Sequence, residues 1–194
     1  MRRSSIERKT AETDIRLSFN LDGTGQSVIS TQVPFLDHML TLFAKHSGFD
    51  LEVTARGDIE VDLHHTVEDI GICLGQAFNT AIGDKKGIIR YGFFILPMDE
   101  ALCRTAIDIS GRPHLTFNAT YPNERTGNFD AQLVHEFFQG FVANAGLTLH
   151  IEVLYGENVH HIIEAIFKSF ARSLSAAVLL NPNSQEIPST KGIL

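Results

Sequence analysis

The chain has 194 residues, of which 43% are hydrophobic and 20% charged, and its formal net charge is -7. This composition is typical of a globular protein long enough to bury a sizeable core. The acidic balance argues against a nucleic-acid partner, which would require a basic stripe. No apolar run approaches the ~18 residues that span a membrane, and no signal peptide opens the chain. We therefore expect a cytoplasmic protein with no membrane partner.

Hydrophobic periodicity predicts the elements of the first half in chain order. Residues 6–12 alternate weakly between apolar and polar, whereas residues 15–21 alternate strictly, as in a half-buried strand. A turn at 22–25 leads into a partner strand over 27–33. Pro34 begins a helix that Gly48 ends. A strand over 49–53 follows, and the next helix stops near residues 83–87.

The second half repeats this order. Residues 93–96 and 101–109 have strand patterns around a turn expected at Pro97, and residues 114–119 have another. Asp130 is expected to cap a helix that runs to about Ala145. A strand over 147–153 follows, and Asn158 is expected to cap the last helix.

A short motif of two histidines and a glutamate occurs twice, each time at the start of an amphipathic helical pattern. Its members are His64, His65 and Glu68 in the first copy and His160, His161 and Glu164 in the second. On a helix the first histidine and the glutamate are four residues apart and face one side, while the second histidine points elsewhere. One copy would be a weak signal, but two copies are hard to explain by packing. The motif therefore predicts metal binding.

The two halves also agree outside the motif. Residues 35–43 match residues 133–141, and residues 49–53 match residues 147–151. The chain thus resembles two copies of a β-β-α-β-α unit, over residues 1–90 and 91–194, which together form one compact domain. Each copy is too small to bury its helices alone. The expected fold is α+β, with the sheets outside and the helices packed between them.

This alignment suggests how metal ligands are distributed. It places His38 opposite Glu136, with His135 as an alternative one residue away. Because neighbouring imidazoles on one helix cannot easily reach the same ion, we expect a crosswise arrangement. One divalent metal is assigned to His64, Glu68, Glu136 and His161, and the other to His38, His65, His160 and Glu164. Nitrogen and oxygen ligands suit Mn, Fe, Zn or Ni, and positions left open on each ion favour a catalytic role.

Basic residues that could bind an anion are scattered along this acidic chain. They are Arg90, Arg112, Lys168 and Lys191. Ser189 and Thr190 precede Lys191 in a hydroxyl-rich turn whose amides and ammonium could hold a phosphate. The alternatives are ordinary surface charges and a disordered C-terminal tail.

With these residues assembled, the chain resembles the imidazoleglycerol-phosphate dehydratase family from end to end. The resemblance is carried by residues 8–13, 35–40, 62–69, 83–88, 160–165 and 188–192. It implies a duplicated unit like the second domain of ribosomal protein S5, two Mn ions per site, and a homo-oligomeric shell of 24 subunits with sites shared between chains. It also implies dehydration of D-erythro-imidazole-glycerol phosphate to imidazole-acetol phosphate in histidine biosynthesis. The family often has His where this chain has Glu136.

The resemblance further implies roles for individual residues. Glu12 is the candidate base for the carbon-bound proton, and Glu68 and Glu164 complete the catalytic set. The phosphate would be held by Arg90, Arg112, Lys168, Ser189, Thr190 and Lys191. The imidazole ring can act as an electron sink as an imidazolate stabilised between two metals.

Two rival functions stay open at this point. The first is a dinuclear metallohydrolase, although such sites are usually richer in carboxylates. The second is a non-enzymatic shell in which metals join the subunits.

Overall fold

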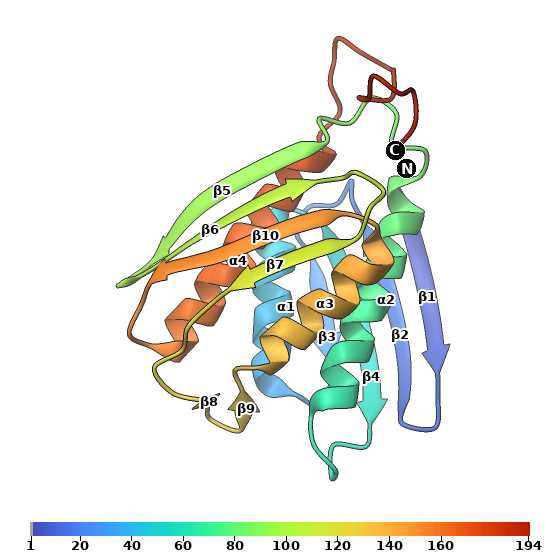
Figure 1. Ribbon diagram of the computed structural model, residues 1–194. Helices are drawn as coiled ribbons and strands as arrows, with labels where there is room; N and C mark the ends of the chain where they lie inside the picture. Colours follow the sequence, from blue (N-terminus) through green and yellow to red (C-terminus); the bar gives the residue numbers. More distant parts are fainter. Residues whose placement is uncertain (1) are drawn as a thin grey trace.

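The computed structural model describes residues 2–194, which form two units with the same order of main elements, and the second unit has an additional short hairpin (Figure 1). The first unit contains β1 (Arg3–Lys9), β2 (Thr13–Asn20), β3 (Ser27–Ser30), α1 (Pro34–Ser47), β4 (Asp50–Gly57) and α2 (His64–Ile82). The second contains β5 (Tyr91–Met98), β6 (Ala101–Asp108), β7 (His114–Asn118), β8 (Arg125–Thr126), β9 (Phe129–Asp130), α3 (Leu133–Ala145), β10 (Thr148–Tyr155) and α4 (Val159–Val178).

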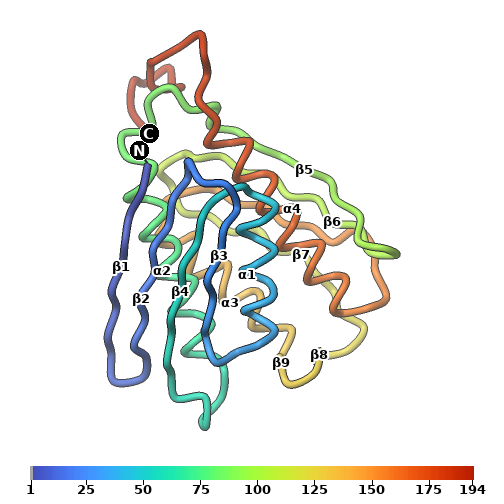
Figure 2. The backbone as a smooth tube through the Cα atoms, turned by 180° about the vertical axis from the view of Figure 1, so that it is seen from behind, coloured from blue at the N-terminus to red at the C-terminus, as the bar shows by residue number. Residues whose placement is uncertain are grey.

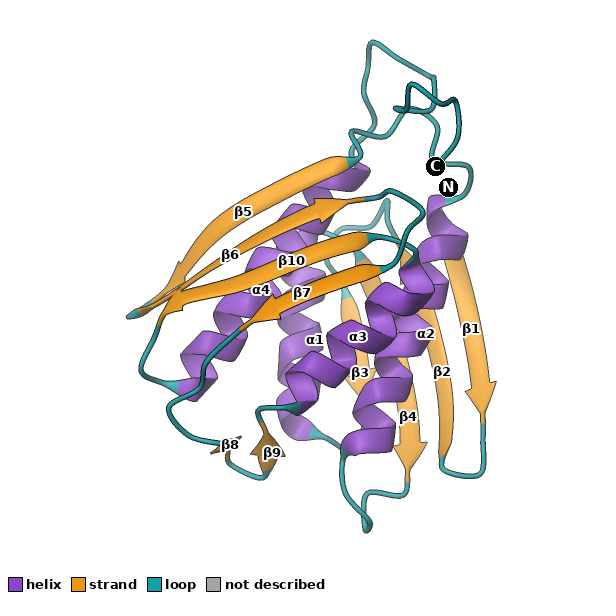
Figure 3. Ribbon diagram, in the orientation of Figure 1, coloured by secondary structure: helices purple, strands orange, loops and turns teal. Residues whose placement is uncertain are grey.

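The two large sheets have the same topology. The strand order is β1-β2-β4-β3 in one sheet and β5-β6-β10-β7 in the other. In both sheets the last strand is parallel to its neighbour, β3 to β4 and β7 to β10, while the other pairs are antiparallel. The helices lie between the sheets (Figure 3), where α2 packs against α3 and α1 against α4. The expected α+β fold with an internal duplication is confirmed.

Three local predictions need correction. Residues 3–9 form a full strand, so three strands of the large sheet precede the first helix of each unit rather than two, and the second unit adds the short β8–β9 hairpin. Pro97 lies inside β5, opposite Leu102, because β5 is an edge strand where a missing N–H is tolerated. Asp130 belongs to β9 and does not cap α3, which begins at Leu133. Its carboxylate accepts the backbone N–H of Gln132 at 3.2 Å and the side-chain amide of Gln132 at 3.3 Å.

The contact between α2 and α3 depends on glycines. A Cβ atom added to Gly71 would lie 2.3 Å from the carbonyl oxygen of Phe137, and one added to Gly75 would lie 2.4 Å from that of Phe141. The contact between α1 and α4 is instead filled by aromatic rings, with Phe43 stacked on Phe170 at 5.4 Å between centroids. The backbones of α2 and α3 can therefore approach closely, whereas side chains separate α1 from α4.

All four helices point their N-terminal ends toward the same end of the molecule. In Figure 1 this is the lower end, and the chain termini with the C-terminal segment lie at the upper end. Figure 2 shows the same arrangement from behind. Across residues 2–194, the structure contains no helix with the length and apolar character needed to cross a membrane.

Candidate active site

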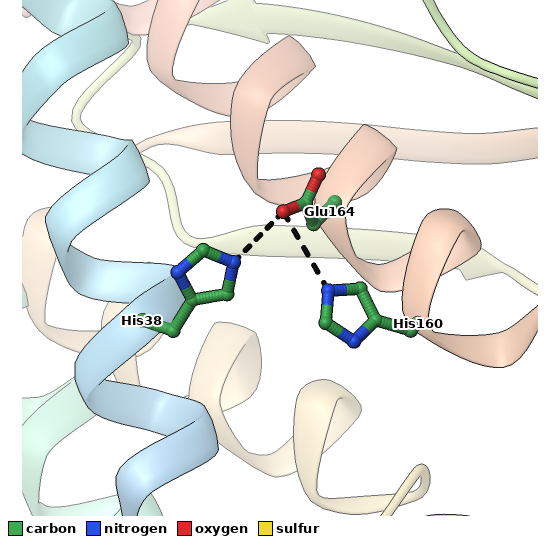
Figure 4. A group of neighbouring side chains, drawn as sticks. All are labelled: His38, His160 and Glu164. Atoms are coloured by element: carbon green, nitrogen blue, oxygen red, sulfur yellow. Dashed lines mark hydrogen bonds and ion pairs between the residues drawn. The ribbon is translucent and has the colours of Figure 1, made fainter.

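Two histidines and a glutamate from the two units meet at the helix N-terminal ends. His38 lies on α1, and His160 and Glu164 lie on α4 (Figure 4). Asn158 caps α4 as expected, since its side chain accepts the backbone N–H of His160 at 2.9 Å and of His161 at 3.5 Å. This cap fixes the first turn of α4 and places His160 and Glu164 on one face.

The ligand atoms of this group converge. Nε2 of His38 lies 2.8 Å from Oε1 of Glu164, and Nε2 of His160 lies 3.6 Å from the same oxygen. One ligand atom from each of the three residues lies within 4.8 Å of the others, and no other such group of three occurs within residues 2–194. Two imidazole nitrogens and one carboxylate oxygen at this spacing fit a divalent transition metal.

Glu164 is nearly buried and its charge is balanced by Lys168. Burial raises the pKa of Glu164, but the hydrogen bonds from Lys168, at 2.7 Å, and from His38 outweigh it, so the pKa lies below its ordinary value. Glu164 is thus held as a carboxylate, the form that binds metal. Lys168 therefore lies beside the candidate metal ligand Glu164 and not with the other residues predicted to bind phosphate.

The equivalent group in the other pair of helices has a much more exposed glutamate, although its histidine is about as exposed as His38 and His160. Nε2 of His64 lies 3.5 Å from Oε2 of Glu68, and both side chains are about two-fifths exposed, at 41% and 42%. On α3, Nδ1 of His135 lies 3.1 Å from a carboxylate oxygen of Glu136. Helices α1 and α3 both end at a glycine in the left-handed backbone conformation, Gly48 and Gly146. His38 lies ten residues before Gly48, and Glu136 lies ten residues before Gly146. Glu136, not His135, is therefore the counterpart of His38.

The second histidine of each motif points away from the first. The rings of His64 and His65 are 6.1 Å apart and nearly perpendicular, and those of His160 and His161 are 6.2 Å apart. Neither His65 nor His161 joins its assigned ligand set within one chain. The crosswise sets are therefore only partly assembled in a single chain.

Each of these outward-facing histidines has a carboxylate partner. Nδ1 of His65 lies 3.0 Å from Asp58, and Nδ1 of His161 lies 2.7 Å from Glu100. The hydrogen bonds that His65 and His161 donate to the carboxylates of Asp58 and Glu100, respectively, raise the pKa of each histidine. The Glu100 pKa falls to about 2, chiefly through the His161 hydrogen bond. Both carboxylates were missed by the sequence analysis, since their spacing from the histidines has no local motif.

Glu12, the candidate base, lies in the turn between β1 and β2. Its Oε1 is 3.9 Å from Nε2 of His65, and its side chain is 53% exposed.

A buried hydrogen-bond network beside Glu12 was also missed by the sequence analysis. The carboxylate of Asp69 accepts hydrogen bonds from Arg8 on β1 and from Thr13 on β2. This network ties both strands next to the Glu12 turn to the first turns of α2.

Most of the basic candidates gather at the opposite end. Arg90, Arg112, Ser189, Thr190 and Lys191 line one open pocket of about 630 Å³. The Arg90 guanidinium is held by Asp108, at 2.7 Å, and donates to the carbonyl of Pro188 at 2.8 Å. Arg90 therefore fixes the base of the C-terminal segment.

The histidine-rich end and the basic end of one chain face in opposite directions. The first lies at the N-terminal ends of the helices and the second beside the C-terminal segment (Figure 1). A small substrate cannot touch both ends of the same chain. If both groups act on one molecule, they come from different copies of the chain.

Known proteins provide an independent comparison. The family model described as imidazoleglycerol-phosphate dehydratase matches residues 31–174. The imidazoleglycerol-phosphate dehydratase of Bacillus licheniformis is 57% identical, and the match covers 100% of both chains.

Two solved structures agree with this comparison. Imidazoleglycerol-phosphate dehydratase from Staphylococcus aureus has a TM-score of 0.84 and 47% identity, over 92% of this chain and 99% of its own. The enzyme from Pyrococcus furiosus, in complex with (S)-C348, has a TM-score of 0.84 and 37% identity, over 97% and 100% of the two chains. The chain therefore belongs to the imidazoleglycerol-phosphate dehydratase family of hydro-lyases.

Proposed function

We propose that this chain converts D-erythro-imidazole-glycerol phosphate to imidazole-acetol phosphate and water in histidine biosynthesis, as a metal-dependent enzyme. Family membership supports the dehydration. The convergence of His38, His160 and Glu164 supports the metal dependence, because three such ligand atoms within 4.8 Å are suited to a divalent ion.

The proposed ligands are the two crosswise sets, with Mn as the ion and two ions per site. One set is His38, His160 and Glu164, completed by His65 of another copy, and the other is His64, Glu68 and Glu136, completed by His161 of another copy. When bound, the ions would supply Lewis-acid stabilisation of the negative charge that develops on the imidazole ring of the substrate.

The residues of the chain would perform the proton transfer and the binding. Glu12 would take the carbon-bound proton, and the departing hydroxyl group would take up one proton and leave as water, so that the net loss of H and OH gives an enol that becomes the ketone. The exposed position of Glu12 beside His65 suits a base that must reach a bound substrate. The basic end, with Arg90, Arg112, Ser189, Thr190 and Lys191, would hold the phosphate and supply binding energy remote from the reacting carbon. Lys168 would contact the phosphate only if it left Glu164.

The opposite placement of the two ends leads to a proposed homo-oligomer, of 24 subunits by family resemblance. Each complete site would combine the histidine-rich end of one chain with the basic end of another. This proposal can be tested by mixing two inactive variants. His38→Ala destroys the first end, and Arg112→Glu destroys the second.

Co-assembly of the two variants in equal amounts should restore about a quarter of the sites, because random mixing pairs an intact first end with an intact second end that often. Each variant assembled alone should stay inactive. If the mixture also stays inactive while both variants assemble normally, the sites are not shared.

Metal dependence has a separate test. Removal of metal with a chelator should abolish dehydration, and added Mn²⁺ should restore it. Unchanged activity after complete metal removal would rule out the metal mechanism. Release of inorganic phosphate from the same substrate, measured in parallel, would favour the metallohydrolase instead.

A further inference from the structure

We propose that Asp58 and Glu100 are positioning residues that hold His65 and His161 through Nδ1, so that each ring presents Nε2 to a metal ion. This inference rests on the metal dependence proposed above. It assigns a role to two carboxylates outside the ligand sets.

Asp58 is aimed at a single side chain. Its two carboxylate oxygens lie 3.2 and 3.0 Å from Nδ1 of His65. Its own backbone N–H donates to the carbonyl of Glu12 at 3.1 Å, which fixes its place beside α2. Within residues 2–194, the Asp58 carboxylate has no other hydrogen-bond partner. The Asp58 carboxylate therefore constrains the ring of His65 and no other described side chain.

Glu100 is held more firmly. Its Oε2 lies 2.7 Å from Nδ1 of His161. Its Oε1 accepts the backbone N–H groups of Glu157, at 3.1 Å, and Asn158, at 2.7 Å. Because one oxygen is fixed by the backbone just before α4, the other oxygen has a defined position for the histidine ring.

The choice of nitrogen is consistent across the candidate ligands. His38 and His160 both turn Nε2 toward Glu164, and His64 turns Nε2 toward Glu68. A carboxylate that accepts the Nδ1 hydrogen fixes the tautomer, leaving the Nε2 lone pair available to a metal. With Asp58 and Glu100 in place, His65 and His161 offer the same nitrogen as the other three.

The two units use different carboxylates for this purpose. Phe19 pairs with Leu51 in the first sheet, and Ile107 pairs with Leu149 in the second. These pairs align Phe19 of β2 with Ile107 of β6. Glu12 lies seven residues before Phe19, and Glu100 lies seven residues before Ile107, so the two glutamates are equivalent, each in the turn of its hairpin.

These equivalent turn residues face different nitrogens. Glu100 contacts Nδ1 of His161, whereas Glu12 lies 3.9 Å from Nε2 of His65, on the side where a metal would bind. In the first unit Asp58 takes over the Nδ1 contact. Glu12 is thereby left free for the reaction, and one copy of a duplicated turn has a structural role while the other has a chemical one.

The test measures Mn²⁺ affinity of the assembled enzyme, after metal removal, from the electron paramagnetic resonance signal of free Mn²⁺. Asp58→Ala and Glu100→Ala should each weaken binding by about 10–100-fold, the usual effect of losing the partner of a histidine ligand. Asp58→Asn keeps an oxygen that can accept the Nδ1 hydrogen and should recover part of the loss. Melting of the metal-free Asp58→Ala variant should stay close to wild type, since its carboxylate has no other partner.

Two matched controls remove a nearby charge without removing an Nδ1 contact. Glu60 is exposed in the loop that carries Asp58, and Asp99 adjoins Glu100 with its carboxylate 3.7 Å from Nε2 of His161. Glu60→Ala and Asp99→Ala should stay within about twofold of wild type, because exposed charges are screened by solvent.

The outcomes separate this inference from the proposed function. If Asp58→Ala binds Mn²⁺ as tightly as wild type, or no more weakly than Glu60→Ala, the positioning role is wrong. If wild-type protein itself binds no Mn²⁺, the proposed metal dependence fails first. Should Glu100→Ala not fold, Asp58→Ala alone decides the question.

Discussion

Replacing Asp69 with alanine should destabilise the protein strongly. The carboxylate is 10% exposed and accepts hydrogen bonds from the Nε of Arg8, at 3.0 Å, and from the Thr13 hydroxyl, at 2.5 Å. Removing one member of a buried pair costs about 3–5 kcal/mol. The Arg8 side chain is 35% exposed, so water can solvate part of the released charge. We therefore expect a loss of about 2–4 kcal/mol, or roughly 4–16 °C in melting temperature.

The assay is thermal unfolding of the metal-free protein followed by circular dichroism. Asp14→Ala is the matched control, because its ion pair with Lys9 on the same hairpin is largely exposed and should contribute about 0–1 kcal/mol. Asp69→Ala should also lower kcat, because the network holds the turn that carries Glu12. Equal melting temperatures for the two variants would refute the view that this network fixes the hairpin.

Three further predictions follow from the packing and the charges. Gly71→Ala should cost about 1–3 kcal/mol in urea unfolding, because its Cβ would lie 2.3 Å from the Phe137 carbonyl oxygen; an unchanged midpoint would show that α2 and α3 separate freely. Hydrogen bonds from the Thr24 and Gln26 backbone lower the pKa of Asp50, so its stabilisation is present above the ordinary pKa and is lost as the pH falls. Stability should thus decline more steeply below about pH 4 in wild type than in Asp50→Asn, and parallel curves would contradict this. Burial raises the pKa of the two thiols to about 11, so neither should react with Ellman's reagent at pH 8 until the protein unfolds.

The fold was largely accessible from the sequence because its strongest patterns are local. The alternation over 15–21 and the glycine that ends α1 define their elements without distant contacts. The β8–β9 hairpin was not predicted, since strands of two residues are too short for periodicity to detect. Asp130 was misplaced for the same reason, because it pairs with Arg125 in that hairpin.

The candidate site was predictable only where spacing along one helix determines geometry. The pairing of His160 with Glu164 follows from their four-residue spacing, but the approach of His38 depends on the packing of α1 against α4. The contacts of Asp58 and Glu100 likewise depend on where turns meet helix ends. The pairing of Lys168 with Glu164 was predictable in the same way, because the two residues are four apart on α4, but the sequence analysis assigned Lys168 to the phosphate instead.

The shared direction of the four helices has an electrostatic consequence. Each helix N-terminus carries roughly half a positive charge from its aligned peptide dipoles, so their common end on its own would attract anions and repel a divalent cation. Glu68, Glu136 and Glu164 lie within the first two turns of α2, α3 and α4, where their carboxylates oppose that local potential. These glutamates therefore do more than donate oxygen atoms, because their negative charge favours a cation at an end of the protein where the helix dipoles alone favour an anion.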